Sequence, residues 1–260
     1  MDLLSTKAML KNWLEELGAF QAKKQYTDLK ISTKENPSDL VTQIDKDSEN
    51  WLIEKIHSSF PSHSIWGEEG GFIKGNSHYV WIMDPLDGTM NYTHGLPIFG
   101  ISLALQSRGE TILGGIHFPR LAETYLAVKG EGAQCNGEDI QVSSEKNPQK
   151  ALLGISIPYA KIAGKISDDY LAPFHSRMRG IRTFGCVVFD LCQLARGNLD
   201  ASLALKMNPW DILGGMLIIK EAGGDYIHQQ VSDNHSLLSA NPKLLSSLKN
   251  DKAFSRLFEI

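Results

Sequence analysis

The sequence predicts a protein of the α+β class, or a closely related layered α/β arrangement. Apolar residues recur at helical spacing near the N-terminus, and short strand-like runs separated by turn residues fill the middle of the chain. After about residue 145 the pattern changes to alternating strands and helices, which is typical of layered folds. The 260 residues are enough for a large core, and no repeat or clear linker divides them. We therefore expect two closely associated halves, 1–145 as an α+β half and 146–260 as an α/β half.

Two helices are predicted in the first sixty residues. Apolar positions between 3 and 17 repeat at helical spacing, and Gly18 is the expected stop of this first helix. Thr42 is the expected cap of a second helix that ends at Pro61. This places Asp45 in the first turn of the second helix.

Strands and helices alternate with turn residues over the remaining chain. Strands are predicted at residues 64–66, 79–83, 98–106, 111–117, 123–128, 152–157, 181–184 and 201–205. Helices are predicted at residues 188–196 and 210–222, and Asn241-Pro242 has the pattern that begins a final helix. Glycines surround Glu68 and Glu69 directly after the first of these strands, so two carboxylates are expected on a turn.

Composition excludes several classes of function. Lys plus Arg number 26 against 30 Asp plus Glu, so the formal charge of −4 gives no electrostatic reason to expect nucleic-acid binding. No run approaches the roughly 18 apolar residues of a membrane span. The three cysteines lack metal-ligand spacing, which favours buried reduced thiols. The histidines, such as His94 and His117, also lack paired spacing and are expected to be structural. We expect a soluble cytoplasmic protein without a membrane or nucleic-acid partner.

The stretch W-I-M-D-P-L-D-G-T-M-N at residues 81–91 has the strongest chemical pattern in the chain. Asp84 and Asp87 bracket Pro85 at the end of an apolar run, where both carboxylates can lie on one side of a rigid turn. Hard divalent cations such as Mg²⁺ bind carboxylate and carbonyl oxygens, so the carbonyl of Leu86 is a further candidate ligand.

A phosphate site can follow directly after these carboxylates. Gly88 lets the backbone approach a ligand, and a helix starting near Thr89 would direct free N–H groups toward an anion. The alternative is an ordinary turn at the end of a strand, because Asp, Pro and Gly are all favoured in turns. Local chemistry leaves both interpretations open.

The same stretch resembles the metal-binding signature of the inositol monophosphatase family, within the superfamily that includes fructose-1,6-bisphosphatases. Other segments are similar to family segments in the same order along nearly the whole chain. They are N-P-S-D-L-V-T-x-x-D at 36–45, P-S-H-S leading to G-E-E at 61–69, K-G-E-G-A with N-G at 129–137, N-P-W-D at 208–211 and E-A-G-G at 221–224.

The resemblance implies a metal-dependent phosphomonoesterase that resembles inositol-1-monophosphatase, with two or three Mg²⁺ ions per site. The metal ligands that it implies are Glu68, Asp84, the carbonyl of Leu86, Asp87 and Asp211. The first metal would use Glu68, Asp84 and Leu86, and the second would use Asp84, Asp87 and Asp211. Glu68 is chosen over Glu69 because it is the first glutamate after Gly67.

The resemblance also assigns the reaction to a metal-activated water. Asp45 and Thr89 match the residues that orient this water, and Glu68 joins them as a catalytic residue through the first metal. Gly88 and Thr89 match donors to the phosphate. Lys34 is similar to an entrance-loop lysine that attracts phosphate or places a third metal, although a simply solvated lysine fits equally well.

The leaving group is left open where the chain departs from its relatives. Inositol-preferring members carry a glutamate seven residues before the position of Asp211, and this chain has Ala204 there. An Ala-Ala segment of the family is replaced by Val187-Val188, so the pocket should recognise polyol hydroxyls less specifically. The residues expected to contact substrate are Asp87, Gly88, Thr89, Val187, Ala204 and Asp211.

Several substrates and one different class of function therefore stay open. The substrate candidates are inositol monophosphate, other sugar or polyol phosphates, histidinol phosphate, NADP and 3'-phosphoadenosine 5'-phosphate. The different class is an interaction protein with a vestigial phosphatase site. The resemblance further implies a layered α/β/α/β/α sandwich, a homodimer and a candidate sensitivity to lithium.

Overall fold

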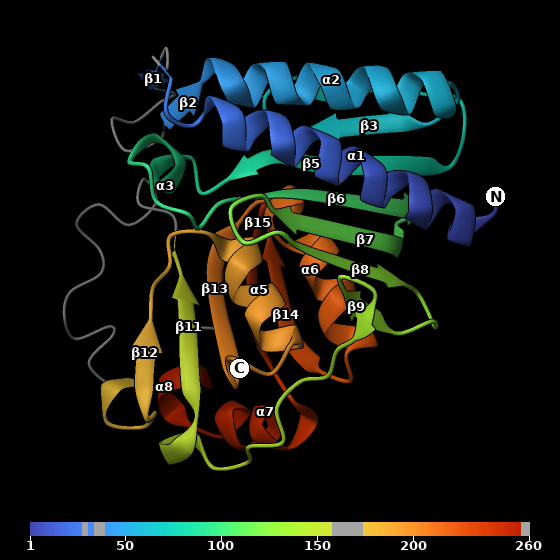
Figure 1. The fold of residues 1–260 in the computed structure, drawn as a ribbon. Helices are drawn as coiled ribbons and strands as arrows, with labels where there is room; N and C mark the ends of the chain where they lie inside the picture. Colours follow the sequence, from blue (N-terminus) through green and yellow to red (C-terminus); the bar gives the residue numbers. More distant parts are fainter. Residues whose placement is uncertain (28–30, 34–39, 158–173, 256–260) are drawn as a thin grey trace.

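The computed structural model of the protein describes residues 1–27, 31–33, 40–157 and 174–255. Its elements stack as alternating layers, from two long helices through a large sheet, a pair of helices and a smaller sheet to the last helices (Figure 1). The predicted α/β/α/β/α sandwich is confirmed. None of the helices in the described part of the chain is long and apolar enough to cross a membrane.

The first helix, α1, spans Leu3–Lys24 and covers the outer face of the large sheet (Figure 1). Asp2 caps it by accepting a hydrogen bond from the Leu4 amide at 3.1 Å. The prediction that Gly18 stops this helix is wrong, because the helix continues for six residues beyond it. An added Cβ at Gly18 would lie 2.4 Å from Cδ2 of His117, so the glycine allows close packing on the sheet.

The second helix, α2, spans Gln43–Ser59 and lies beside α1 on the same face of the sheet. Thr42 caps it as predicted, and its hydroxyl accepts from the Ile44 amide at 3.1 Å. Asp45 completes a capping box, since its Oδ2 accepts from the Thr42 amide at 2.8 Å. The start of this helix therefore fixes the Asp45 side chain.

The large sheet contains eight strands in the order β10-β9-β8-β7-β6-β5-β3-β4. In chain order these are β3 Ser64–Gly67, β4 Gly71–Ile73, β5 Tyr79–Asp87, β6 Gly100–Ser107, β7 Glu110–Phe118, β8 Glu123–Val128, β9 Ala133–Cys135 and β10 Glu138–Asp139. The prediction that the strand at 79–83 stops at Asp84 is wrong, because β5 continues to Asp87 with a register shift against β6. That irregularity turns the signature stretch out of the regular ladder.

The smaller sheet follows the order β12-β11-β13-β15-β14. Its strands are β11 Leu152–Ser156, β12 Gly180–Arg182, β13 Ala201–Met207, β14 Asp225–Val231 and β15 Asn234–Ala240. The β14–β15 hairpin was not predicted, because β14 reads D-Y-I-H-Q-Q-V and lacks a clean apolar alternation. A separate two-stranded ribbon pairs β1 Ile31–Thr33 with β2 Leu40–Thr42.

The remaining helices form the middle and outer helical layers. They are α3 Thr89–Thr93, α5 Val187–Ala195, α6 Pro209–Glu221, α7 Pro242–Lys249 and α8 Lys252–Ser255, with a 3-10 turn at Pro148–Lys150. The predicted helices at 188–196 and 210–222 are confirmed to within a residue at each end. Asn241 caps α7 as predicted, but α8 follows it, so α7 is not the final helix.

Helices α5 and α6 lie between the two sheets and share one hydrophobic core with both of them (Figure 1). Ile116 and Tyr125 of the large sheet belong to this core, as do Ala204 and Leu237 of the smaller sheet. A second core joins α1 and α2 to the outer face of the large sheet. The central layer therefore holds the two sheets together.

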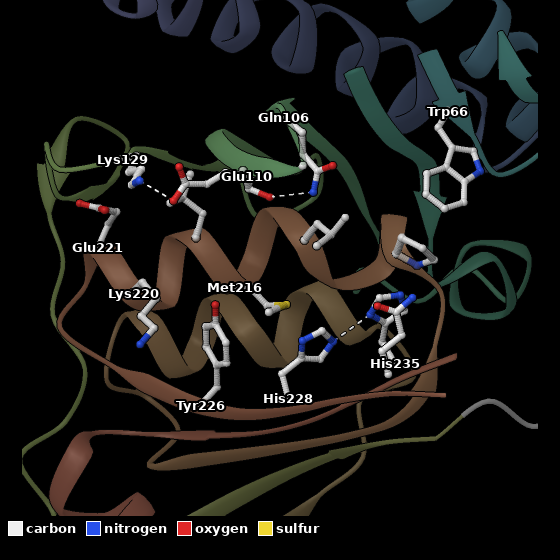
Figure 2. A pocket seen from close by; sticks show the side chains of 16 residues that line it. Trp66, Gln106, Glu110, Lys129, Met216, Lys220, Glu221, Tyr226, His228 and His235 are labelled. Atoms are coloured by element: carbon white, nitrogen blue, oxygen red, sulfur yellow. Dashed lines mark hydrogen bonds and ion pairs between the residues drawn. The ribbon is translucent and has the colours of Figure 1, made fainter. Parts of the chain in front are cut away.

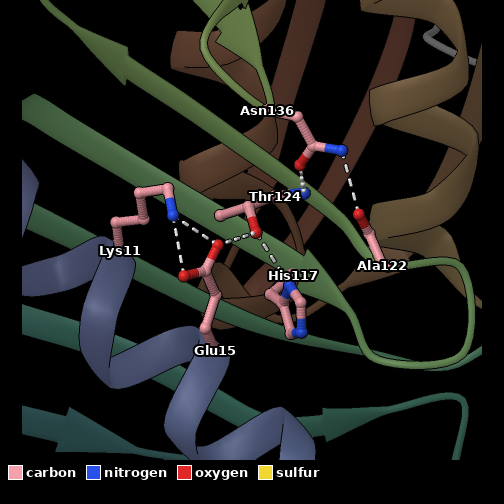
Figure 3. A network of polar contacts seen from close by, with 6 residues as sticks. All are labelled: Lys11, Glu15, His117, Ala122, Thr124 and Asn136. Atoms are coloured by element: carbon pink, nitrogen blue, oxygen red, sulfur yellow. Dashed lines mark hydrogen bonds and ion pairs between the residues drawn. The ribbon is translucent and has the colours of Figure 1, made fainter.

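A polar network fastens α1 to the large sheet (Figure 3). The Thr124 hydroxyl donates to Glu15 Oε1 at 3.1 Å, and it lies 2.9 Å from Nδ1 of His117. Because a hydroxyl has one proton, Thr124 accepts from a protonated Nδ1 when it donates to Glu15. Lys11 also bonds Glu15, at 2.6 Å, and Asn136 accepts from the Thr124 amide at 2.9 Å. His117 has the structural role expected for it.

Candidate active site

The candidate site lies where β5 ends and where α2, α5 and α6 begin. Asp84 and Asp87 come from β5, and Glu68 follows β3, which pairs with β5 in parallel. Asp45 lies in the first turn of α2 and Asp211 in the first turn of α6. The signature stretch therefore meets residues from both ends of the chain.

The signature loop is shaped by its own side chains. Asp84 is buried, and its Oδ1 accepts a hydrogen bond from the Leu86 amide at 2.8 Å. Gly88 has a φ of 85°, in the left-handed region that favours glycine. A Cβ at that position would also lie 3.0 Å from the carbonyl oxygen of Ile98. The loop thus turns sharply into α3, as the predicted Asp-Pro-x-Asp-Gly turn requires.

Asp45 and Thr89 meet across the start of α2. The Thr89 hydroxyl lies 3.1 Å from Asp45 Oδ1 and 3.0 Å from the carbonyl oxygen of Leu86. The other carboxylate oxygen of Asp45 accepts from the Thr42 hydroxyl at 2.6 Å and from the Thr42 amide at 2.8 Å. Both oxygens of Asp45 are therefore held in fixed directions.

Asp87 connects the signature loop to the central layer. Its Oδ2 accepts from the Val188 amide at the start of α5 at 2.8 Å. The Cys186 thiol lies 3.7 Å from the Asp87 carbonyl oxygen and is buried, and Cys192 is a buried free thiol as expected. The first turn of α5 therefore fixes one carboxylate of the site.

Asp211 is held by the first turn of α6. Its Oδ2 accepts from the Asn208 amide at 2.7 Å, which forms a capping box. The Ser102 hydroxyl on β6 donates to the carbonyl oxygen of Trp210 at 3.2 Å. This second contact attaches the start of α6 to the large sheet, next to the strand that carries Asp84.

Burial and mutual repulsion dominate the electrostatics of the site. Burial raises the pKa of Asp45 to about 6, against the opposing effect of its bonds from Thr42. Burial also raises the pKa of Asp87 to about 6. The pKa of Asp84 lies well above its usual range, because the carboxyl is buried and because Glu68, Asp87 and Asp211 lie near it. The carboxylates predicted to share a site therefore interact in the structure.

The donor set suits a hard divalent cation. Carboxylate oxygens and the Leu86 carbonyl are the ligands that such ions prefer, and a cation would relieve the repulsion that raises the pKa of Asp84. Within the described ranges, no group of three or more Asp, Glu, His or Cys side chains is arranged so that it could hold a metal ion. Asp84, Asp87 and Asp211 each direct one oxygen toward a backbone amide instead.

The expected substrate residues are distributed unevenly. Gly88 and Thr89 adjoin the acidic group, whereas Val187 and Ala204 are buried, with exposed fractions of 5% and 0%. Both side chains belong to the central core, and Ala204 pairs in register with Ser156 of β11. Lys34 lies outside the described residues.

Sequence reasoning missed Glu49, which lies one helical turn after Asp45 on α2. Its Oε2 accepts from the Glu69 amide at 2.9 Å, and Oε1 accepts from the Gly70 amide. It therefore contacts the turn that carries Glu68. The spacing of four residues between two acidic side chains on one helix face was the signal that could have identified it.

A separate pocket of about 660 Å³ lies along α6, between the large sheet and the β14–β15 hairpin (Figure 2). Trp66 and Pro209 line the end of the pocket near the candidate site, and His228 and His235 line its floor. His228 Nε2 lies 2.8 Å from His235 Nδ1, and the two rings are stacked. None of the candidate metal ligands lines this pocket.

Comparisons with known proteins agree on one family. The model of the inositol monophosphatase family matches residues 8–255. The inositol-1-monophosphatase of Bacillus subtilis is 35% identical over 253 residues, covering 95% of this chain and 96% of that protein. The Nus factor SuhB of Pseudomonas aeruginosa is 35% identical over 230 residues, covering 84% of each chain.

Solved structures lead to the same family. The structure of an IMPase from Thermotoga maritima superposes with a TM-score of 0.86 at 32% identity, covering 100% of this chain and 99% of that one. The match therefore extends over every layer of the fold and every element of the candidate site. From the family model, the relatives and the fold together, the chain belongs to the inositol monophosphatase family, a family of phosphatases.

Proposed function

We propose that the protein is a Mg²⁺-dependent phosphomonoesterase that hydrolyses a small phosphorylated metabolite, with inositol monophosphate as the first candidate. The observation that carries this proposal is the hydrogen bond between Thr89 and Asp45 beside the buried acidic group around Asp84. It combines an oriented hydroxyl with the oxygen ligands that a divalent cation requires.

Glu68, Asp84, the Leu86 carbonyl, Asp87 and Asp211 are the residues proposed to hold Mg²⁺. When bound there, the ion would supply Lewis acidity, which lowers the pKa of a water molecule and stabilises charge on the phosphoryl group and the leaving oxygen. Capping boxes and helix starts fix Asp45 and Asp211, so the protein fixes part of this arrangement in advance.

Thr89 and Asp45 are proposed to orient the attacking water. When the Thr89 hydroxyl donates to Asp45, its oxygen can accept a hydrogen bond from water, and Thr89 can take the proton of the water as it passes its own proton to Asp45. Asp45 has a pKa of about 6, so it is ionised at neutral pH and can accept the proton that passes through Thr89. The backbone amides of Gly88 and Thr89 are the proposed donors to the phosphate.

The leaving group is the less determined part of the proposal. Apolar Ala204 and Val187 provide no polar partner for ring hydroxyls, and polyol recognition depends on such partners. Other sugar phosphates, histidinol phosphate, NADP and 3'-phosphoadenosine 5'-phosphate therefore stand as alternative substrates. Phosphate release from this panel, with Mg²⁺ and with EDTA, measures the preference directly.

A second candidate function is interaction with a macromolecular partner. It is favoured by the relatives named Nus factor SuhB, one of which is 35% identical to this chain. In that case the fold is retained while the phosphatase site is vestigial. The two functions make opposite predictions for activity.

Asp87→Asn provides the decisive comparison, because Asn keeps an oxygen that can accept from the Val188 amide. We expect Mg²⁺-dependent phosphate release by the wild-type protein and a loss of about 100-fold or more in Asp87→Asn. Asp47→Asn, at an exposed position of α2, is the matched control and should keep wild-type activity. No metal-dependent release from any substrate would reject the enzyme function in favour of the interaction function.

A further inference from the structure

We propose that Glu49 is a positioning residue that sets the turn bearing Glu68 for metal binding. The inference deepens the proposed function and rests on it, since it names the group that holds one of the proposed ligands in place. Glu49 itself is not a metal ligand in this proposal. It acts through the backbone of the turn between β3 and β4.

The contact uses both oxygens of one carboxylate. Glu49 Oε2 accepts from the Glu69 amide at 2.9 Å, and Oε1 accepts from the amide of Gly70. These are the two peptide groups that follow Glu68 directly. Because successive amides bind the same carboxylate, the orientation of the peptide after Glu68 is fixed relative to α2.

The glycines of the turn show that the chain is built closely around this carboxylate. A Cβ at Gly67 would lie 2.6 Å from Oε2 of Glu49, and a Cβ at Gly70 would lie 2.7 Å from Oε1. Side chains at either position would displace the carboxylate from its amides. The G-E-E-G sequence thus combines a proposed metal ligand with two glycines that admit Glu49.

The carboxylate of Glu49 is buried next to other acidic side chains. Glu49 is 2% exposed and lies near the carboxylates of Glu68 and Glu69. Replacing this carboxylate with an apolar group would leave the amides of Glu69 and Gly70 without their acceptor. The buried carboxylate therefore holds the backbone of the turn that bears Glu68.

The same helix sets two proposed functions at once. Asp45 and Glu49 lie four residues apart on α2, which places them on one face, separated by about one helical turn. Asp45 directs the Thr89 hydroxyl, while Glu49 directs the turn of Glu68. One rigid element therefore sets the spacing between the water-orienting pair and a proposed ligand of the first metal.

The test measures Mn²⁺ binding to metal-free protein. Binding is monitored as the loss of the electron paramagnetic resonance signal of free Mn²⁺. Glu49→Gln keeps the shape but replaces one acceptor oxygen with an NH₂ group. We expect its Mn²⁺ affinity to fall about 10-fold or more, as is usual when a group that orients a ligand is lost. Glu54→Gln, at an exposed position of the same helix, should bind as the wild type does.

A double-mutant cycle with Glu68→Gln separates positioning from general damage to the fold. If Glu49 acts through Glu68, then Glu49→Gln should not weaken Mn²⁺ binding further once Glu68→Gln is present. If Glu49→Gln lowered the Mn²⁺ affinity of the Glu68→Gln variant by the same factor as that of the wild type, the inference would be overturned. Should Glu49→Gln fail to fold, Glu49→Asp, which keeps both oxygens on a shorter side chain, undergoes the same comparison.

The wild-type titration distinguishes failure of the inference from failure of the proposed function. If the wild type binds Mn²⁺ and Glu49→Gln binds it equally well, the positioning role is rejected and the proposed phosphatase function stands. If the wild type and Glu54→Gln bind no Mn²⁺, the proposed metal site is rejected and the role of Glu49 is rejected with it.

Discussion

The hydroxyl of Thr89 lies 3.1 Å from Oδ1 of Asp45, and this contact joins the start of α3 to the start of α2. The second oxygen of Asp45 is held by Thr42, so the carboxylate can turn neither away from Thr89 nor toward solvent. Asp45 therefore has two roles. It completes the capping box of α2 with Thr42, and it is the proposed proton acceptor for Thr89.

Removing the Thr89 hydroxyl should abolish most activity while leaving the fold intact. Thr89→Val has the same shape but cannot donate to Asp45, so we expect kcat to fall about 100-fold or more. Thr89→Ser keeps the hydroxyl and should retain activity within about 10-fold. The measurement is steady-state phosphate release with saturating Mg²⁺, and equal activity in the valine and serine variants would contradict the role of this hydroxyl.

Removing the metal should reveal a trade-off between stability and metal binding at Asp84. In metal-free protein, Asp84→Asn should melt about 2–4 °C higher than the wild type, which corresponds to about 1 kcal/mol in a protein of this size. The reason is that Asn relieves repulsion from Glu68, Asp87 and Asp211 and can still accept from the Leu86 amide.

Addition of Mg²⁺ should then reverse the order of these two proteins. The wild type should gain thermal stability, because a ligand that binds the folded state stabilises it, while Asp84→Asn should gain little. Calorimetry with EDTA and with Mg²⁺ measures both differences. A wild-type melting temperature that does not respond to Mg²⁺ would contradict this prediction.

Asp190 should give the stability of the protein a specific dependence on pH. This carboxyl is fully buried on α5 and accepts from the Ser156 hydroxyl at 2.6 Å, and burial raises its pKa to about 7. In the unfolded chain an Asp carboxyl has a pKa of about 3.9, so it is protonated only below about that pH. Between pH 4 and 7 the folded state therefore binds more protons, and the free energy of unfolding falls as the pH rises.

Asp190→Asn stays neutral at every pH and should lose this dependence. The variant should gain stability relative to the wild type as the pH rises from 5 to 7, by up to about 1.4 kcal/mol per pH unit, and the difference should level off between pH 7 and 8. Urea unfolding at pH 5, 6, 7 and 8 measures the difference, with exposed Asp139→Asn as the control. If the free energies of unfolding of the wild type and Asp190→Asn changed equally with pH, the raised pKa of Asp190 would be contradicted.

Gly18→Ala should destabilise the protein, although the same change inside an exposed helix usually stabilises it by about 1 kcal/mol. The added methyl would lie 2.4 Å from Cδ2 of His117 and 3.1 Å from Cγ of Pro119. We expect a loss of about 1–3 kcal/mol in urea unfolding. His117→Ala should remove the clash, so Gly18→Ala should cost less in that background.

Local sequence patterns predicted the structure correctly where residues close together in the sequence determine it. Thr42 and Asp45 predicted a capped helix because the cap depends on four adjacent residues. The Asp-Pro-x-Asp-Gly pattern predicted a turn at Gly88 for the same reason. The family segments placed Glu68 and Asp211 beside it, and the structure brings these carboxylates near Asp84.

Long-range packing set the limits of prediction. Gly18 reads as a helix stop because nothing local shows that His117 lies against it. Polar residues in β14 hide a strand that pairs along its whole length with β15. Glu49 was not identified from the sequence, and its partners Glu69 and Gly70 lie about twenty residues away. The contacts of Gly18 and Glu49 join residues that lie far apart in the sequence, whereas β14 was missed because its own residues lack a strand pattern.

The core around α5 and α6 contains residues from both halves of the sequence, so neither half can form it alone. The inner face of the large sheet, with Ile116 and Tyr125, is covered by helices that belong to the second half of the sequence. A fragment ending near residue 145 would leave that apolar face in water, and one beginning there would lack Asp84 and Asp87. Division of the chain at this point would therefore separate residues that belong to one core.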